Sequence, residues 1–336
     1  MPESLRISVK EAESELIRVM IARGFSVDRA KTCASVFIGN SLDGVYSHGL
    51  NRFSRFIGYV RDGGIKPDAI PVLKNKMGGM EQWDGKSGPG PLNAIKCVDR
   101  AMSLAAENGI GCVAVGRSNH WLRGGTYGWR AAKKGFALIA WSNTIANMPA
   151  WGAVDARLGN NPLVIAIPYQ GEAIVVDFAM TQYSYGAVEV AIMKGEKLGM
   201  HGGYDTHGNL TNDPVEIKKS WRALPIGYWK GSGLSLLLDI LATTLSAGLS
   251  VHEITAQNSE VNASQVFIAI DLAKLDSNQS MQQAIEKIIA DFKQSVPESG
   301  KKSVRYPGEN VLATRTENTA NGIPVLKEVW EEIRNL

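Results

Sequence analysis

From about residue 92 onward, the apolar residues of this 336-residue chain follow a pattern of alternating helices and strands. A helical spacing of apolar residues ends at Gly109, and the apolar run 110–115 follows it directly. Two further apolar runs flank residues 169–172, which have the composition of a hairpin turn. The pattern predicts helices at 92–108, 126–134 and 233–247, and strands at 110–115, 136–141, 163–168, 173–178 and 266–270. An α/β or α+β fold follows, with a mixed sheet because the hairpin interrupts the alternation.

Both ends of the chain have helical patterns. Ser8 and Glu11 have the spacing of a capping box before a first helix, and a second helix is predicted at 26–40. Further helices are predicted at 281–292 and 325–333, with a linker at 297–303. We therefore expect a smaller helical domain made of residues 1–70 and 295–336, and a mixed-sheet domain made of residues 71–294 that binds cofactor and substrate. The apolar helix at 233–247 is expected to be buried.

Residues 109–114 match the dinucleotide-binding pattern G-x-G-x-x-A. A Rossmann fingerprint follows a strand and begins a helix, so that the pyrophosphate lies at the helix N-terminus. Here a predicted helix comes first and a predicted strand follows. We interpret Gly109 as the end of that helix, so any dinucleotide must bind this chain through a non-Rossmann arrangement.

Charge and composition narrow the class of protein. The chain has 36 basic and 33 acidic residues, a balance that gives no general footprint for nucleic acid. No apolar run reaches the roughly 18 residues that span a bilayer. The first residues lack the basic and apolar regions of a signal peptide, and the 3 cysteines have no paired spacing. We expect a cytoplasmic protein with neither a nucleic-acid nor a membrane partner.

His48 lies in the polar segment Tyr46-Ser47-His48-Gly49, and Arg52 follows four residues later. Reduction of a ketone needs a proton donor at the developing alkoxide, and histidine can donate near neutral pH. Arg52 could bind both oxygens of a 2-oxo acid carboxylate, and a helix over this segment would place it on the same face as His48. Gly49 would let a substrate approach closely. The alternatives are a surface-loop histidine and an arginine that only pairs locally, in which case Arg123 is the next anchor to consider.

His120 comes directly after the strand that begins at residue 110, where α/β folds often hold functional groups. A structural polar loop is the alternative. His48 and His120 together could bind a metal, but no other His or Cys lies at ligand spacing, so we expect no metal site.

Residues 227–233 form a glycine-rich segment that leads into the apolar helix. Free backbone N–H groups at such a helix start can receive a phosphate; Lys230 would add a positive charge, and Trp229 could pack on a ring. A glycine-rich helix start without a ligand is the alternative. Residues 307–310 have the composition of a turn.

Several of these segments together are more specific than any one of them. The Ser-His-Gly segment with Arg52, Asn119 with His120, and the runs 159–162 and 230–233 resemble the type-2 malate/L-lactate dehydrogenase family, which is unrelated to the Rossmann lactate dehydrogenases. The runs 81–84, 120–125, 151–153 and 227–230 are similar to members of that family that reduce a diketo sugar acid. The resemblance covers nearly the whole chain.

This resemblance implies a non-Rossmann α/β fold, a homodimer, and a nicotinamide cofactor (NADH, with NADPH not excluded) near the dimer interface. It assigns His48 as the proton donor. The cofactor-binding residues that it implies are Ala173, Ile174, Val175, Val176, Asp177, Phe178, Ala179, Trp229, Lys230, Gly308, Glu309 and Asn310. Trp121 departs from many family members, which have Phe followed by Gly, and is expected to narrow or reshape the pocket, against plain lactate or malate activity.

We therefore expect an NAD(P)-dependent oxidoreductase that transfers hydride to the C2 carbonyl of an open-chain 2,3-diketo sugar acid. His48 supplies the proton, while Arg52 and His120 hold the substrate carboxylate and carbonyl. One alternative is a reductase of another 2-oxo acid or a cyclic imino acid, of the malate, lactate or ureidoglycolate type. The other is a sugar-acid binding protein without catalysis.

Overall fold

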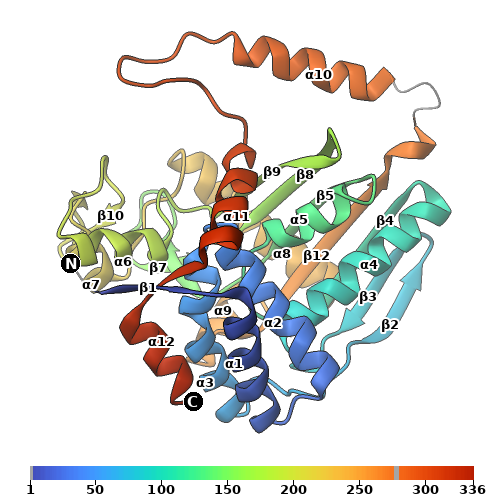
Figure 1. The fold of residues 1–336 in the computed structure, drawn as a ribbon, viewed down its shortest axis with the longest axis horizontal. Helices are drawn as coiled ribbons and strands as arrows, with labels where there is room; N and C mark the ends of the chain where they lie inside the picture. The colour runs from blue at the N-terminus through green and yellow to red at the C-terminus, as the bar shows by residue number, and fades with distance from the viewer. Residues whose placement is uncertain (1–2, 276–279) are drawn as a thin grey trace.

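The computed structural model describes residues 3–275 and 280–336. Residues 1–2 of the expected helical domain and residues 276–279 of the expected mixed-sheet domain lie outside this description. A twisted sheet forms the centre of the larger part, with α4 and α5 on one face and α8 on the other (Figure 1). The helices are α1 (Val9–Ala22), α2 (Val27–Leu42), α3 (Phe53–Arg61), α4 (Gly90–Asn108), α5 (Gly125–Ala132), α6 (Tyr185–Lys194), α7 (Pro214–Ser220), α8 (Trp229–Ser246), α9 (Val251–Ala256), α10 (Ser280–Lys293), α11 (Glu309–Asn321) and α12 (Lys327–Arg334).

Seven of the strands in the described residues form the central sheet, in the order β2-β3-β4-β12-β5-β8-β9. Only β3 and β4 pair in parallel, and every other neighbouring pair is antiparallel, which confirms the predicted mixed sheet. Its strands are β2 (Val72–Met77), β3 (Met80–Asp84), β4 (Ile110–Asn119), β5 (Phe136–Ser142), β8 (Leu163–Tyr169), β9 (Glu172–Phe178) and β12 (Val261–Asp271). The shorter strands are β1 (Ser4–Ile7), β6 (Ala146–Pro149), β7 (Ala156–Gly159), β10 (Gly203–Tyr204), β11 (Leu210–Thr211) and β13 (Ile323–Leu326).

The segment that matches G-x-G-x-x-A is a helix end followed by a strand, as the order of elements predicted. Gly109 ends α4 with a φ of 86°, which glycine adopts without strain. Gly111 lies in β4, where an added Cβ would come within 2.2 Å of the Ala101 carbonyl oxygen. The two glycines therefore let α4 pack closely against β4.

The predicted hairpin is also present. β8 and β9 pair from Leu163↔Phe178 to Tyr169↔Glu172, and the two residues between them, Gln170 and Gly171, have φ values of 49° and 76°. Positive φ at both central positions is typical of the type I′ turn, whose twist matches that of the paired strands.

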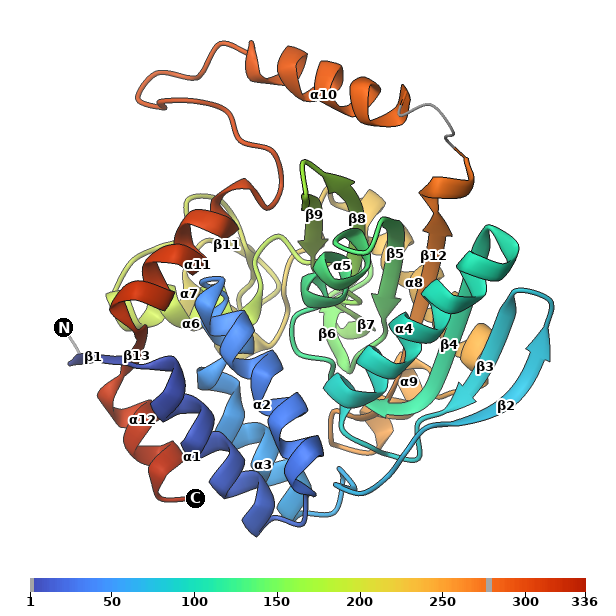
Figure 2. The same cartoon turned by 45° about the vertical axis from the view of Figure 1, so that its right-hand side comes forward.

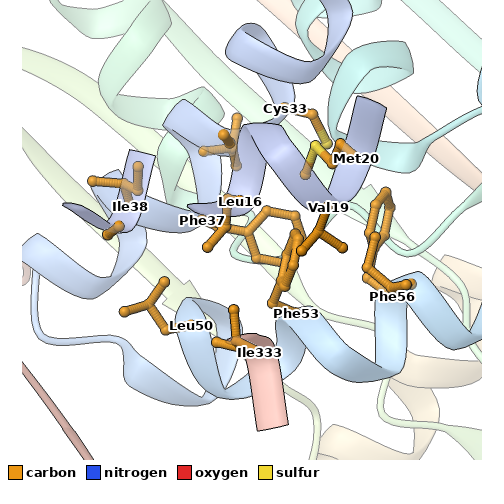
Figure 3. Close-up of a cluster of buried hydrophobic side chains, with 14 of the residues drawn as sticks. Leu16, Val19, Met20, Cys33, Phe37, Ile38, Leu50, Phe53, Phe56 and Ile333 are labelled. Carbon is orange, nitrogen blue, oxygen red and sulfur yellow. The ribbon is translucent and has the colours of Figure 1, made fainter. Parts of the chain in front are cut away.

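The two ends of the chain meet in a helical core beside the sheet (Figure 2). β1 pairs with β13 in antiparallel register and joins the N-terminal to the C-terminal segment. Figure 3 shows Phe37 and Phe53 at the centre of this core, with Leu16 and Val19 from α1 and Ile333 from α12 around them. Phe37 and Phe53 meet edge to face with ring centroids 5.3 Å apart. The division into domains at residues 70 and 295 stays a prediction.

Two predictions of local structure were wrong. Residues 323–326 form β13, so the last helix begins at Lys327 rather than at Val325, because pairing with β1 takes up the first part of that segment. α8 is not fully buried: one side packs on the sheet through Leu238 and Ala242, but Leu237 on the opposite side is 57% exposed. An apolar helix predicts a buried surface, but part of this surface is left uncovered by the described residues.

Candidate active site

His48 lies in a short connection that the side chains of Asn40 and Thr126 hold in place. After α2 the chain forms two 3-10 turns, Tyr46–His48 and Leu50–Arg52. Asn40 Nδ2 donates to the His48 carbonyl oxygen at 2.8 Å, and Asn40 Oδ1 accepts from Thr126 Oγ1 at 2.6 Å. Because Asn40 is buried and bonded on both sides, it links the position of His48 to α2 and to the first turn of α5.

Gly49 has a different role from the one expected. An added Cβ would lie 2.0 Å from Ser41 Oγ, and Ser41 Oγ accepts the backbone N–H of Leu50 at 2.9 Å. The space beside Gly49 is therefore filled by Ser41 and not open to a substrate. The glycine allows two parts of the protein to approach each other closely.

The two predicted histidines lie face to face. The rings of His48 and His120 stack with centroids 5.6 Å apart and an angle of 17° between their planes. His120 Nδ1 accepts the backbone N–H of Leu122 at 3.0 Å, so in the neutral ring the proton is on Nε2. His48 Nδ1 lies 3.0 Å from Ser47 Oγ, and a hydrogen bond between these two atoms can orient the His48 ring.

Both histidines are neutral at pH 7 in the free protein. Burial lowers the pKa of His48 to about 4, and the positive charges of Arg52 and Arg123 act in the same direction. Burial lowers the pKa of His120 well below its usual value, with Arg52 and His48 adding to the effect. An anion bound beside these rings would oppose the arginine charges and raise both pKa values.

A small pocket joins Arg52, His120, Asn119 and Glu260. Its apolar wall consists of Phe56, Tyr59, Ile65 and Leu122. Arg52 Nη2 donates to Glu260 Oε2 at 2.7 Å, and the side chains of both residues are at most 19% exposed. Arg52 is thus neither at the surface nor paired with a residue near it in sequence.

The expected helical spacing of His48 and Arg52 was wrong, because Gly49 separates the two 3-10 turns. Sequence analysis did not identify Glu260, because it lies in the loop before β12, 208 residues from Arg52, and belongs to no motif.

The other two residues considered for this pocket lie elsewhere. Arg123 is buried and pairs with Asp43, which also accepts from Arg315 Nε at 2.6 Å. Trp121 packs in the core against Tyr127 and Phe267, with ring centroids 5.7 and 5.8 Å away. The expectation that Trp121 narrows the pocket was therefore wrong, and it gives no argument against a smaller 2-oxo acid.

Two of the three predicted cofactor-binding segments are in contact. Ala173–Phe178 lie in β9, Ala179 follows it, and Gly308 precedes Glu309 and Asn310 at the start of α11. Val175 N donates to the Pro307 carbonyl oxygen at 3.2 Å, and Gly308 lies over this strand with a φ of 88°. Asp177 is half-buried: desolvation raises the pKa of its carboxyl, and its Oδ2 accepts the backbone N–H of Gly125 at 2.7 Å. Asp177 therefore holds the start of α5 against β9.

The third segment lies beyond the end of β9. Ile226 N donates to the Met180 carbonyl oxygen at 2.8 Å and so joins the loop before α8 to the chain that follows β9. Trp229 is 65% exposed, and Lys230 Nζ lies 6.0 Å from the Trp229 ring centroid. The Thr181 hydroxyl is buried in this region without a hydrogen-bond partner among the described residues.

These residues suit a dinucleotide. An exposed indole, a lysine at the start of an 18-residue helix and an unpaired buried hydroxyl supply a stacking surface, a positive charge and a polar contact. The start of α6 packs against the segment that carries the first histidine: a Cβ on Gly186 would lie 2.7 Å from Ser47 Cβ, next to His48.

Among the residues that the structure describes, no group of three or more His, Cys, Asp and Glu side chains is placed to hold a metal ion. No helix in the described ranges has the length and apolarity needed to cross a bilayer.

Comparison with known proteins identifies the family and agrees with the fold. The malate/L-lactate dehydrogenase family pattern matches residues 7–334. The chain is 44% identical to the 2,3-diketo-L-gulonate reductase of Pasteurella multocida over 333 residues, 99% of this chain and 100% of that protein. It is equally similar, 44% over 333 residues with the same coverage, to the 2,3-diketo-L-gulonate reductase of Escherichia coli O127:H6.

Solved structures share the fold. A malate dehydrogenase from Entamoeba histolytica superposes with a TM-score of 0.94 at 22% identity, covering 99% of this chain and 97% of that one. A putative malate/lactate dehydrogenase from E. coli superposes with a TM-score of 0.91 at 25% identity, covering 98% and 93%. The mixed sheet and its helices are therefore the fold of this group of dehydrogenases.

Proposed function

Because the chain belongs to the malate/L-lactate dehydrogenase family, we propose that it reduces the C2 carbonyl of an open-chain 2,3-diketo sugar acid, with His48 as proton donor. The observation that carries the assignment of roles is the stacked pair of His48 and His120 beside a pocket that holds Arg52. Full-length similarity to reductases of that substrate supports the choice of substrate.

Three groups would act on the substrate. His120 offers its Nε2–H to the carbonyl oxygen, since its Nδ1 is already occupied by Leu122 N–H. Arg52 holds the carboxylate. It donates to Glu260 through Nη2, and its Nη1 and Nε protons have no hydrogen-bond partner in the described part of the chain. His48 transfers a proton to the oxygen that becomes the C2 hydroxyl, with Asn40 fixing its backbone.

We propose NADH as the cofactor, with NADPH as an alternative to be tested. When bound, it supplies the hydride that reaches C2. β9, Gly308, Glu309 and Asn310 would hold one part of it, and Trp229 and Lys230 another. Glu309 is itself positioned by Lys293, whose Nζ lies 2.6 Å from Glu309 Oε2.

We further propose a homodimer formed through the exposed apolar side of α8. Leu234, Leu237 and Leu241 lie at helical spacing on this side, with Ile240 beside them. A contiguous apolar surface of this kind on a water-soluble fold is typical of a protein interface. The 3 free cysteines favour a reducing compartment, and we propose the cytoplasm.

The test is oxidation of NADH, and separately NADPH, against a panel of acids. The panel contains a 2,3-diketo sugar acid, pyruvate, oxaloacetate and a cyclic imino acid. The highest kcat/KM is expected for the diketo sugar acid. A clearly higher kcat/KM for another member would replace the substrate but keep the reaction class. Binding of the acids without any consumption of NADH or NADPH would instead favour a sugar-acid binding protein.

A further inference from the structure

We propose that Glu260 is a specificity-determining residue that makes this pocket select a hydroxylated monocarboxylate and reject a dicarboxylate. The proposal rests on the function proposed above, because it concerns the same pocket. It deepens that function by stating why one class of 2-oxo acid is accepted there and another is not.

The presence of a carboxylate in this pocket is the starting observation. Glu260 lines the same cavity as Arg52 and His120, and its side chain is 11% exposed. A pocket that binds only anionic groups has no need of a buried negative charge, because that charge weakens the binding of every anion. Glu260 must therefore have another role, either in holding the arginines or in choosing the ligand.

The charges around the pocket can be counted. Arg52 Nη2 lies 2.7 Å from Glu260 Oε2, and Arg55 Nη2 lies 3.8 Å from the same atom. Glu189 in α6 is a further negative charge that acts on Arg55. Both histidines are neutral at pH 7, since burial lowers their pKa values. Arg52 and Glu260 are the charged residues that line the pocket, and the positive charge of Arg55 is offset by Glu189, so beyond Arg52 the pocket has no spare cation for a second carboxylate.

A second carboxylate on the substrate would lie beside the Glu260 carboxylate, with no free cation to neutralise it. Like charges brought together in a partly desolvated site are strongly unfavourable, and natural binding sites use such repulsion to exclude wrong ligands. Glu260 instead favours binding of substrate hydroxyl groups, because these can donate hydrogen bonds to a carboxylate oxygen. Among the described residues Glu260 Oε1 has no hydrogen-bond donor, so it is available to accept a hydrogen bond.

Position in the fold supports a role in the pocket. Glu260 comes directly before β12, whose first residue Val261 pairs with Asn119, the neighbour of His120. Glu260 and His120 therefore lie at the same end of two neighbouring strands, β12 and β4. Arg52 lies in the 3-10 turn that follows the one carrying His48. The ion pair thus joins the two segments that supply the proposed catalytic groups.

The first experiment uses the wild-type protein alone and compares oxaloacetate with its 4-methyl ester. The two compounds share the 2-oxo acid group and differ in one negative charge. We expect kcat/KM for the ester to be at least about tenfold higher. Equal values, or a preference for oxaloacetate, would overturn the proposal.

The second experiment compares Glu260→Gln and Glu260→Asp with the wild type. Gln keeps the size and polarity of the side chain but removes its charge, so the preference for the ester should fall below about threefold. Asp keeps the charge and should retain most of the preference. Glu317→Gln is the matched control, since it removes a carboxylate from an exposed pair with Arg6 and should leave the preference unchanged.

The outcomes separate the two proposals. An active wild type whose preference is the same in Glu260→Gln would overturn the role of Glu260 and leave the reductase intact. A wild type that reduces no 2-oxo acid would overturn the proposed function, and the role of Glu260 with it. If Glu260→Gln fails to fold, equal kcat/KM values for the ester and oxaloacetate in the wild type would still overturn the proposal.

Discussion

His48 is neutral in the free protein, although the proton donor that we propose it to be must carry a proton when the carbonyl is reduced. Burial and two nearby arginines lower its pKa to about 4. The ring must therefore gain a proton at or after binding of the anionic substrate, which offsets the arginine charges. A low pKa in the free state suits the reverse reaction, in which neutral His48 accepts the proton of the alcohol.

This arrangement predicts different pH profiles for the two directions. kcat/KM reports the ionisation of the free enzyme, and reduction needs the protonated ring. Above a pKa of about 4, the protonated fraction falls tenfold per pH unit. We expect kcat/KM for reduction to fall about tenfold per unit between pH 5 and 8, while kcat/KM for oxidation stays flat. Steady-state kinetics in both directions test this; a reduction profile that is level up to about pH 6.5 would contradict it.

The same burial makes stability depend on pH. Because the pKa of His48 is about 4 when folded and near 6.5 when unfolded, the unfolded chain binds more protons between these values. Stability is therefore lost as the pH falls from 6.5 towards 4, by about 2 kcal/mol at pH 5 for this residue.

We expect His48→Gln to reduce the difference in unfolding free energy between pH 7 and pH 5, measured by urea denaturation. Gln does not titrate, so the contribution of residue 48 disappears. His252→Gln, a change at an exposed histidine, is the control. An unchanged difference in His48→Gln would show that the buried ring does not control the acid sensitivity.

Gly49 gives a prediction about packing. An alanine Cβ would lie 2.0 Å from Ser41 Oγ and 2.9 Å from Ser41 N, so the turn that carries His48 must move. We expect Gly49→Ala to destabilise the fold by about 1–3 kcal/mol and to lower kcat. Gly39→Ala in α2 has open space and should stabilise by about 0.5–1 kcal/mol, which makes it the control. A Gly49→Ala protein of normal stability and rate would refute the close packing seen here.

At the scale of elements, the sequence predicted what depends on local spacing. The helix 92–108, the strand after it and the two-residue hairpin turn have local causes: periodic apolar residues, a terminal glycine and residues that accept positive φ. Contacts between residues far apart in the sequence could not be predicted from local spacing. Glu260 lies 208 residues from Arg52, and pairing with β1 turned the predicted helix start at 325 into a strand.

The start of α8 is the element that most directly tests the cofactor assignment. Lys230 is exposed at the first turn and forms no ion pair with any described residue, so an anion can reach it. We expect Lys230→Ala to raise the Kd of NADH by about three- to tenfold, as for one exposed charge pair of about 1 kcal/mol. Lys31→Ala, an exposed lysine in α2, should have no effect. Equal Kd values by fluorescence titration in all three proteins would remove Lys230 from the site.

At the scale of the whole molecule, the proposed site lies where the helical core meets the sheet. His48 and Arg52 follow α2 of the helical core, whereas His120 and Glu260 lie at the ends of β4 and β12. Motion of one part against the other would change the distance between Arg52 and Glu260. The proposed catalytic groups are therefore brought together only by the complete fold, which explains why no single motif reveals the site.

The apolar side of α8 gives the last prediction, which concerns assembly. Leu237 and Ile240 are 57% and 48% exposed, on the side of the helix that faces away from the sheet. In a twofold dimer each residue of the interface occurs twice, so one added charge places two charges in the contact. We expect the wild type to sediment at twice the chain mass of 36.3 kDa, and the Leu237→Asp/Ile240→Asp double variant at the mass of one chain. Val27→Asp, at an exposed apolar residue of α2, should remain a dimer. Sedimentation of the wild type as a monomer at high protein concentration, or of the double variant as a dimer, would show that α8 does not form the proposed interface.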